Sequence, residues 1–424
     1  MATATTQDFV LFWCDNVAID TYAAALSCTD PRMPFRTLGA VHVGRPITTD
    51  PDAPRNAIDP ETTARYDRID GRRLAGFLHR AGRDPPVYLA GPAEVHVVPR
   101  AQHIDTADLL RPGDEQQRVG DLDALVAELR EVDGTVHVIG AGPLTGLERL
   151  IDDKQIRAKL GTLVFQGGLH DWTDSKIKDP ETQLVQAGSG EISTRPFAKA
   201  AFNNAAAPAA AYDCLTRWPG DRILLPTDIT RHPAMEFSSA DELDQLGFYG
   251  ELVDAYRKVY GLYDEYQQRV KAGLSPEKLA SFRDRPTKPV LHDAHLPVIL
   301  ADRIRADHNS VTPDQSETWC GDYGLRSVEF SEVPATSAPL EQRQAWGSRP
   351  TFTEAPGRNT GTYIVRYHAG SPDQPAQHRH RQTLLGTLSK SQFNQVRPAE
   401  QRALGERPKI GARRPAGQGR GIHR

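Results

Sequence analysis

The chain has 424 residues, of which 38% are hydrophobic and 25% are charged, and its formal net charge is −4. These values are typical of a soluble protein with a sizeable core, and they exclude a strong overall attraction to nucleic acid or to an anionic membrane. The first ten residues lack the basic and apolar regions of a secretory signal, and no stretch reaches the ~20 apolar residues of a membrane span. We therefore expect a cytoplasmic protein with neither a membrane nor a nucleic acid as its partner.

The cysteines lie far apart and show no CxxC spacing, so the sequence indicates neither a zinc site nor a disulfide framework. Unpaired cysteines are among the residues most often found inside proteins. We expect buried free thiols at Cys14, Cys28, Cys214 and Cys320.

Short apolar runs that end at glycine, proline or a polar residue predict strands. The expected strands are 9–13, 38–43, 86–91, 135–140, 162–168, 222–228 and 289–293. Helical spacing of apolar residues occurs between them, at 18–27, 72–81, 122–131, 146–160, 205–216 and 240–272. This alternation predicts an α/β fold of the Rossmann-like type, with a mostly parallel sheet flanked by helices. Ligands of such sheets bind beyond the carboxyl ends of the strands.

Two polar, proline-containing stretches, 48–70 and 95–117, are expected to be long loops or insertions. Beyond Ala301 the alternation weakens, although 327–330 and 361–368 still predict strands. The tail at 371–424 is rich in Arg, Gln, Pro and Gly, which predicts a basic, largely disordered segment. We expect one α/β domain over residues 1–370, followed by this tail.

Three short motifs carry residues suited to catalysis, and each follows an expected strand. Asp15 and Asp20 come after the first strand, and clustered carboxylates are the oxygen ligands that Ca²⁺ prefers. His292 and Asp293 end a later strand, where a histidine is able to protonate a leaving group near neutral pH. The turn at 138–147 contains Gly-Ala-Gly-Pro, which exposes backbone groups to a ligand. Each motif alone is better explained by a helix cap, a half-buried histidine or an ordinary tight turn.

Together, and in this order, the motifs resemble those of the inosine-uridine preferring nucleoside hydrolases. The run WCDNVAID at 13–20 is similar to the family's DxDxGxDD, AGPLTG at 141–146 to TGPLTN, and HDA at 292–294 to HDP. Weaker similarities follow the family's order at 71–91, 163–168, 200–215 and 224–235. The resemblance covers about residues 9–370 and implies the nucleoside hydrolase fold.

The resemblance implies hydrolysis of the N-glycosidic bond between a base and a ribose. It implies a Ca²⁺ cofactor held by the carboxylates of Asp15, Asp20 and Asp293 and by the backbone carbonyl of Ala141. It assigns Asp15 as the base that accepts a proton from the attacking water, and His292 as the acid that protonates the leaving base. It also implies a small-molecule nucleoside substrate and a homodimer or homotetramer.

The same resemblance suggests residues for substrate binding. Asn203 is retained from the family's motif, Gln166 replaces a methionine, and Arg45 replaces an asparagine that follows the second strand. In the family, the neighbourhood of Tyr256 approaches the base, so this ring is a candidate for stacking. Its position in an aromatic run at helical spacing favours a core role.

Several of the family's ribose contacts are altered. Trp13 and Val17 depart from the first motif, Ile19 replaces the aspartate that holds the ribose hydroxyls, and Ala201 replaces the glutamate that contacts the 5′-hydroxyl. Loss of a charged hydrogen bond costs about 1.5–3 kcal/mol. Ordinary ribonucleosides are therefore expected to bind weakly.

A 5′-phosphate is one group that these changes would admit, because Ala201 removes a carboxylate while Arg45, Arg195 and Lys199 offer positive charge. Solvated surface charge is the simpler explanation of Arg195 and Lys199. Two alternatives stay open beside the hydrolase. One is a catalytically impaired relative that binds a ligand or has a structural role, and the other is a phosphatase that uses the same aspartates.

Overall fold

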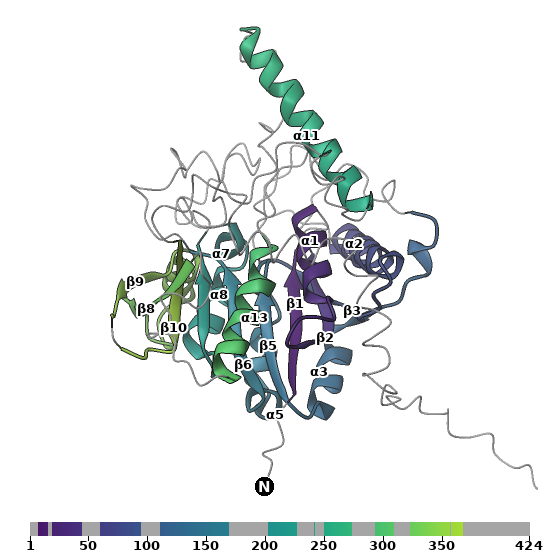
Figure 1. Ribbon diagram of the computed structural model, residues 1–424. Helices are drawn as coiled ribbons and strands as arrows, with labels where there is room; N and C mark the ends of the chain where they lie inside the picture. The colour runs from purple at the N-terminus through teal and green to yellow at the C-terminus, as the bar shows by residue number, and fades with distance from the viewer. Residues whose placement is uncertain are drawn as a thin grey trace, which may run out of the picture.

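The computed structural model describes residues 7–15, 19–44, 60–94, 111–168, 202–226, 241, 250–273, 293–308, 323–356 and 358–367. A ten-stranded sheet runs through them in the order β4-β3-β2-β1-β5-β6-β7-β10-β8-β9 (Figure 1). The strands are β1 (Asp8–Cys14), β2 (Arg36–Gly44), β3 (Val87–Pro92), β4 (Val119–Asp121), β5 (Thr135–Gly140), β6 (Leu160–Gln166), β7 (Arg222–Leu225), β8 (Tyr323–Ser331), β9 (Thr351–Glu354) and β10 (Thr362–Tyr367).

The sheet is parallel from β4 to β10, and β8 and β9 extend it in antiparallel pairs. This arrangement, with its helical cover, confirms the predicted α/β class. The chain adds β2, β3 and β4 on one side of β1 and then returns to add β5 on the other side. The switch point between β1 and β5 is where parallel sheets bind their ligands, at the carboxyl ends of the strands.

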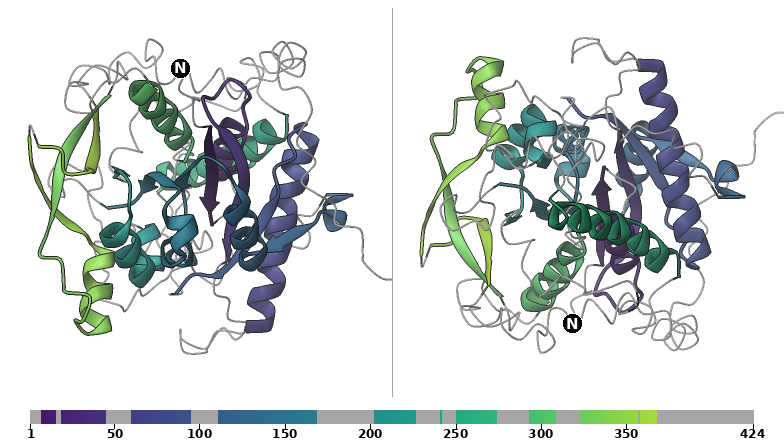
Figure 2. Two further views of the ribbon diagram at one scale, coloured as in Figure 1. Left: turned by 90° about the horizontal axis from the view of Figure 1, so that it is seen from below. Right: turned by 90° about the horizontal axis from the view of Figure 1, so that it is seen from above.

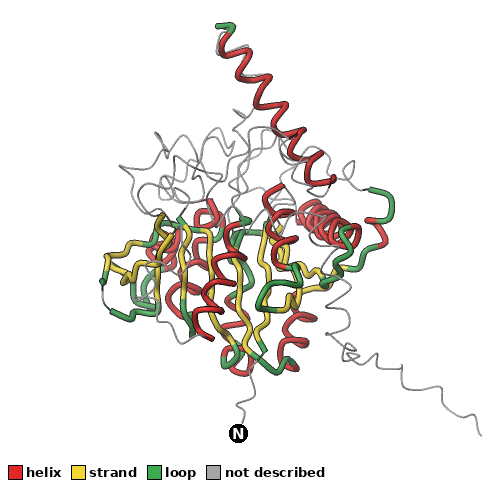
Figure 3. The backbone as a smooth tube through the Cα atoms, viewed as in Figure 1, coloured by secondary structure: helices red, strands yellow, loops and turns green. Residues whose placement is uncertain are grey.

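Helices cover both sides of the sheet, as the views along the strands show (Figure 2). They are α1 (Ile19–Cys28), α2 (Pro60–Arg80), α3 (Leu122–Glu131), α4 (Glu148–Asp152), α5 (Lys154–Arg157), α7 (Phe202–Ala206), α8 (Pro208–Arg217), α13 (His295–His308) and α14 (Leu340–Ser348). A further helix, α11 (Gly250–Lys271), contacts α1 and projects beyond the carboxyl ends of the strands (Figure 1). A short 3₁₀ helix, η3 (Asp114–Gln116), lies near α2. Figure 3 shows these helices against the strands of the sheet.

Successive residues of β1 point to opposite faces of the sheet. Val10, Phe12 and Cys14 belong to a buried cluster shared with α1, α2, α11 and α13. Leu11 and Trp13 belong to a second cluster, shared with α3, α4, α8 and α14. Because both faces are covered, the run FVLFW is apolar throughout rather than alternating.

Helix α2 begins earlier than the sequence predicts. Residues 48–70 were expected to form a loop, but the chain is helical from Pro60 onward. Proline suits the first position of a helix, where its missing N–H is not needed. The buried face of the first turns carries Thr63 and Asp67 instead of large apolar residues, and this hides the helical periodicity.

Other boundaries also differ from the prediction. The expected helix at 146–160 divides into α4 and α5 at Asp153, whose carboxylate accepts hydrogen bonds from the N–H groups of Gln155 and Ile156. A new helix, α8, starts at Pro208 after α7. The sequence did not predict β4, β9, α13 or α14, which are short or follow the weakly patterned region.

Some expectations concern residues outside those described. They include the tail at 371–424, residues 95–110, and the expected strand at 289–293 apart from Asp293. Cys14, Cys28 and Cys214 are free and buried, as predicted, whereas Cys320 is not among the described residues. Within the described ranges, no helix has the length and apolar character needed to span a bilayer.

A buried ion pair holds α2 against the end of β2. The Nε2 atom of His42 lies 3.3 Å from the Oδ1 atom of Asp67, and both side chains are buried. A Cβ atom on Gly44 would lie 2.8 Å from the Cγ atom of Asp67, so the carboxylate lies directly on the strand. Burial, partly offset by the charge of His42, raises the pKa of Asp67 to about 6.

Replacing Asp67 with asparagine should change how stability depends on pH. The pKa of Asp67 is about 6 in the folded protein but ~4 in an unfolded chain, so the folded form takes up a proton first as the pH falls. From pH 7.5 to 4.5, the wild type should gain about 2 kcal/mol of unfolding free energy relative to Asp67→Asn. Urea unfolding across this range measures the difference, and a difference that does not vary with pH would contradict the prediction.

Candidate functional site

Asp15 and Ala141 lie side by side at the switch point of the sheet. Asp15 directly follows β1 and Ala141 directly follows β5, and the Ala141 N–H donates a 2.7 Å hydrogen bond to the Trp13 carbonyl. A Cβ atom on Gly142 would lie 2.6 Å from the backbone nitrogen of Asp15, so this approach requires glycine. The Gly-Ala-Gly-Pro turn therefore packs directly against the first candidate carboxylate.

Asp293 brings an acidic side chain to the same region from the start of α13. It is only 4% exposed, and the hydroxyl of Thr21 on α1 donates a 3.4 Å hydrogen bond to its Oδ2 atom. Burial, followed by the negative charges of Asp20 and Asp15, raises the pKa of Asp293 well above its usual value. The structure thus brings the three acidic residues of the sequence motifs close enough to interact.

The thiol of Cys14 borders the same acidic group. Burial is the main cause that raises the pKa of Cys14 well above its usual value, and the charges of Asp15, Asp293 and Asp20 add to it. A cysteine needs a lowered pKa to act as a nucleophile. Cys14 is therefore a packing residue, and its environment is a second sign that the carboxylates gather at the end of β1.

The chemistry of these residues suits a hard cation. Carboxylates and a backbone carbonyl are oxygen donors, and a positive charge among them would offset the repulsion that Asp293 experiences. In the part of the chain that the structure describes, however, no group of three or more His, Cys, Asp or Glu side chains is arranged so that it could hold a metal ion. Binding of Ca²⁺ by Asp15, Asp20, Asp293 and Ala141 therefore stays a prediction.

Asn203, on α7, joins the ends of β5 and β6. Its Nδ2 atom donates hydrogen bonds to the carbonyls of Ala141 at 3.1 Å and Gln166 at 2.9 Å. Both bonds use Nδ2, so the acceptor Oδ1 takes no part in them. The Oε1 atom of Gln166 is buried and has no hydrogen-bond partner among the described residues. Two residues assigned to substrate binding thus lie beside the candidate carbonyl ligand.

The sequence analysis missed the role of the neighbouring Asn204. Its Oδ1 atom accepts a 2.7 Å hydrogen bond from the Gly168 N–H, and its Nδ2 atom donates one of 3.0 Å to the Gly347 carbonyl. It therefore connects the turn after β6 to the end of α14. A signal was present, since an asparagine within the apolar run FNNAAA needs hydrogen-bond partners if it is buried.

The remaining candidates lie apart from the acidic group or outside the described residues. Tyr256 is fully buried in the hydrophobic cluster that includes α1 and α13, the core role that its helical spacing favours. Trp13 belongs to the cluster on the opposite face, and its indole N–H donates a 3.2 Å hydrogen bond to the Thr145 carbonyl. The residues outside the described ranges are Arg45, Lys199, His292, Val17 and Ala201.

Solved structures share this architecture. The type III effector protein XopQ, complexed with adenosine diphosphate ribose, matches with a TM-score of 0.52 at 13% identity, over 92% of this chain and 95% of its own. An inosine-guanosine nucleoside hydrolase matches with a TM-score of 0.50 at 13% identity, over 90% of this chain and 98% of its own. The effector protein XOO4466 matches with a TM-score of 0.50 at 14% identity, over 92% of this chain and 94% of its own. The chain has a nucleoside hydrolase-like fold.

The nucleoside hydrolase-like fold confirms the architecture that the motifs implied. No family model matches the sequence, and no curated protein matches it. At 13–14% identity, the structural likeness concerns the fold alone. The inosine-uridine subclass stays a prediction.

Replacing Asn203 with alanine should lower the free energy of unfolding by about 1–3 kcal/mol, because the buried Ala141 and Gln166 carbonyls would lose their donor. Urea unfolding measures the loss. The matched control is Asn359→Ala at an exposed position, where the side chain accepts a bond from the Tyr363 hydroxyl and the loss should stay below about 1 kcal/mol. Equal losses of unfolding free energy in the two variants would show that the hydrogen bonds of Asn203 to Ala141 and Gln166 stabilise the protein no more than an exposed hydrogen bond does.

Proposed function

We propose that the protein is an N-ribohydrolase that cleaves the bond between a base and a ribose. The proposal is supported by the position of Asp15, which follows β1 at the switch point, and by the burial of Asp293, which accepts a hydrogen bond from Thr21 of α1, in a nucleoside hydrolase-like fold. Ligands of parallel sheets bind at this point, and grouped carboxylates are able to bind a cation and accept protons. Membership of the inosine-uridine preferring subclass and a homodimeric or homotetrameric assembly in the cytoplasm belong to the same proposal.

The proposed reaction assigns a role to each end of the broken bond. Asp15 accepts a proton from the water that attacks the anomeric carbon, which becomes oxocarbenium-like as the bond to the base breaks. His292 gives a proton to the nitrogen of the departing base, so the products are free base and ribose. Asn203 and Gln166 orient the sugar from the ends of β5 and β6.

Ca²⁺ is the proposed cofactor, with the Asp15, Asp20 and Asp293 carboxylates and the Ala141 carbonyl as its ligands. Bound there, the ion would supply Lewis acidity that lowers the pKa of water at the site. The protein's own contribution would be to keep Asp15, Asp293 and Ala141, which are buried, at one end of the sheet. Close packing of Gly142 on Asp15 and the Thr21 hydrogen bond to Asp293 support this arrangement.

Two variants should test the acidic residues directly. Asp15→Asn and Asp293→Asn are expected to lower the rate of base release from a nucleoside panel about 100-fold or more, the usual scale for loss of an acid–base group. Both should also weaken Ca²⁺ binding measured by isothermal titration calorimetry. Chelation of the wild type should abolish base release, and added Ca²⁺ should restore it.

Asp123→Asn is the control for these variants. Asp123 is an exposed residue of α3, it pairs with Arg149, and it is distant in the sequence from Asp15, Asp20 and Asp293. This variant should leave base release and Ca²⁺ binding unchanged.

Two other outcomes would indicate a different function. A wild type that binds a nucleoside without producing ribose would support a second candidate, a catalytically impaired relative that binds a ligand. The altered residues Ile19 and Ala201 favour that candidate. Phosphate release without base release would indicate a phosphatase.

We also propose that the substrate carries a 5′-phosphate. One structure of similar fold was solved with adenosine diphosphate ribose, in which the ribose carries a 5′-diphosphate. In this chain, Ala201 replaces a glutamate, and Arg45 and Lys199 add positive charge to segments next to described parts of the site. Charge-assisted hydrogen bonds would then favour an anionic 5′-group.

Base release from a nucleoside 5′-monophosphate should be faster than from the parent nucleoside. One charged hydrogen bond contributes about 1.5–3 kcal/mol, which corresponds to a kcat/KM ratio of about 10 to 100. Arg45→Met should remove most of this ratio while leaving the unphosphorylated nucleoside unaffected. A preference for the unphosphorylated nucleoside would refute the proposal.

A further inference from the structure

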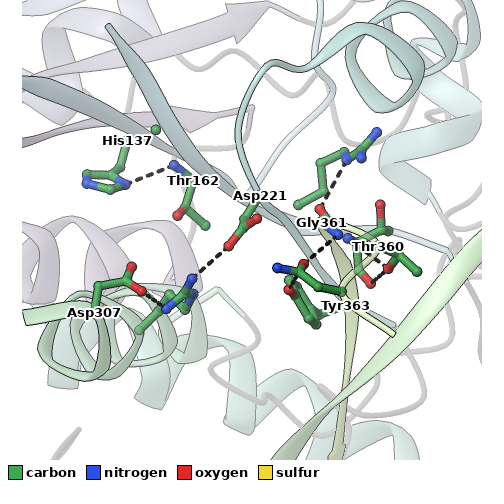
Figure 4. Close-up of polar contacts among 12 residues, drawn as sticks. His137, Thr162, Asp221, Asp307, Thr360, Gly361 and Tyr363 are labelled. Atoms are coloured by element: carbon green, nitrogen blue, oxygen red, sulfur yellow. Dashed lines mark hydrogen bonds and ion pairs between the residues drawn. The ribbon is translucent and has the colours of Figure 1, made fainter. Parts of the chain in front are cut away.

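A buried arginine lies at the edge of the sheet opposite the acidic residues. Arg303, near the end of α13, is only 7% exposed. Its Nη2 atom donates a 2.8 Å hydrogen bond to the Oδ2 atom of Asp221, which directly precedes β7, and its Nη1 atom pairs with Asp307 on the same helix. Figure 4 shows the Asp307 and Asp221 carboxylates on either side of this guanidinium.

The strands beside this arginine carry further polar contacts at the same edge. His137, on β5, accepts a 2.9 Å hydrogen bond at Nδ1 from the Thr162 N–H of β6 (Figure 4). An N–H donor fixes Nδ1 as the acceptor, so the ring proton lies on Nε2, which is 3.2 Å from the Asp8 carboxylate. Polar residues at or near the starts of β1, β5, β6 and β7 therefore form a polar border, and Arg303 connects α13 to it.

Stability alone does not account for this arrangement. Removing a charge from water costs free energy, and Arg303 is buried while its partners Asp221 and Asp307 stay 26% and 46% exposed, where ion pairs contribute little. The Nε atom of Arg303 is also buried and lacks a hydrogen-bond partner among the described residues, which adds a further cost. A charge pair between a helix and the start of a strand favours one position of the helix over others.

Because helix α13 is stiff, a contact that fixes its position at Arg303 also fixes its first residues at the other edge of the sheet. It packs on β5 and β6, and Asp293 lies two residues before its first residue, His295. At ~1.5 Å per residue, Arg303 lies about 12 Å along the helix from His295. Near the start of the helix, the Thr21 hydroxyl donates a 3.4 Å hydrogen bond to Asp293, and the negative charges of Asp20 and Asp15 act on the same carboxylate.

We infer that Arg303 is a positioning residue, which holds α13 against β7 so that Asp293 stays beside Asp15 and Asp20. The expected effect on cation binding by these carboxylates rests on the proposed function. The position of the helix itself does not depend on that function.

The test compares two arginines of the same helix. Arg303→Met removes the connection to Asp221, whereas Arg305→Met makes the same change at a side chain that is 48% exposed and pairs with Asp302 on its own helix. Hydrogen exchange of the amides in residues 294–300 should become about tenfold faster in Arg303→Met and stay unchanged in Arg305→Met. Ca²⁺ affinity should fall about tenfold in the first variant only.

Two further variants keep the test decisive if Arg303→Met does not fold. Asp221→Asn retains the arginine but removes its charged partner on the strand side, and it should reproduce both effects in weaker form. Arg303→Lys should restore part of the Ca²⁺ affinity, because it keeps the charge without the paired geometry. Faster exchange confined to residues 303–308 in both Arg303→Met and Asp221→Asn would overturn the inference. A wild type that binds no Ca²⁺ would instead refute the proposed function, and the exchange data would still decide the role of Arg303.

Discussion

The packing of α1 and α13 on the central strands is the constraint on which the candidate site depends, because it buries Asp293 near two other carboxylates. Burial is the main cause that raises the pKa of Asp293, and repulsion from the charges of Asp20 and Asp15 adds to it. The apolar cluster that packs α1 and α13 on β1 and β5 keeps these groups together in spite of the repulsion. Core packing therefore leaves negative charge in an unfavourable environment at the switch point, and a bound proton or cation would stabilise it.

Polar side chains fix the two edges of the sheet in different ways. At the carboxyl edge, Asn203 bonds only to backbone carbonyls, so it joins β5 and β6 without adding charge near the carboxylates. At the amino edge, Arg303 joins α13 to β7 through an ion pair.

The altered first motif has a structural explanation at Trp13. Strand alternation directs this position to the face opposite Cys14, where a large indole fills the cluster shared with α3, α4 and α8. Its N–H bonds to the Thr145 carbonyl and so stabilises the turn after β5. Trp13 therefore fills the core behind the candidate site, whereas Asp15, one residue beyond the strand, lies at its edge.

The sequence by itself determined the α/β class and most strands of the central sheet, and it predicted that acidic residues following the strands form the site. It could do so because apolar runs, glycine turns and strand-end carboxylates are local patterns. Only the tertiary structure decided where α2 begins, how α4 and α5 divide, and which polar residues connect distant strands. Thr63, Asp67, Asn204 and Arg303 are buried polar residues, and a polar residue in the sequence does not reveal that it is buried. Their partners come from chain segments that meet only after the helices have packed on the sheet.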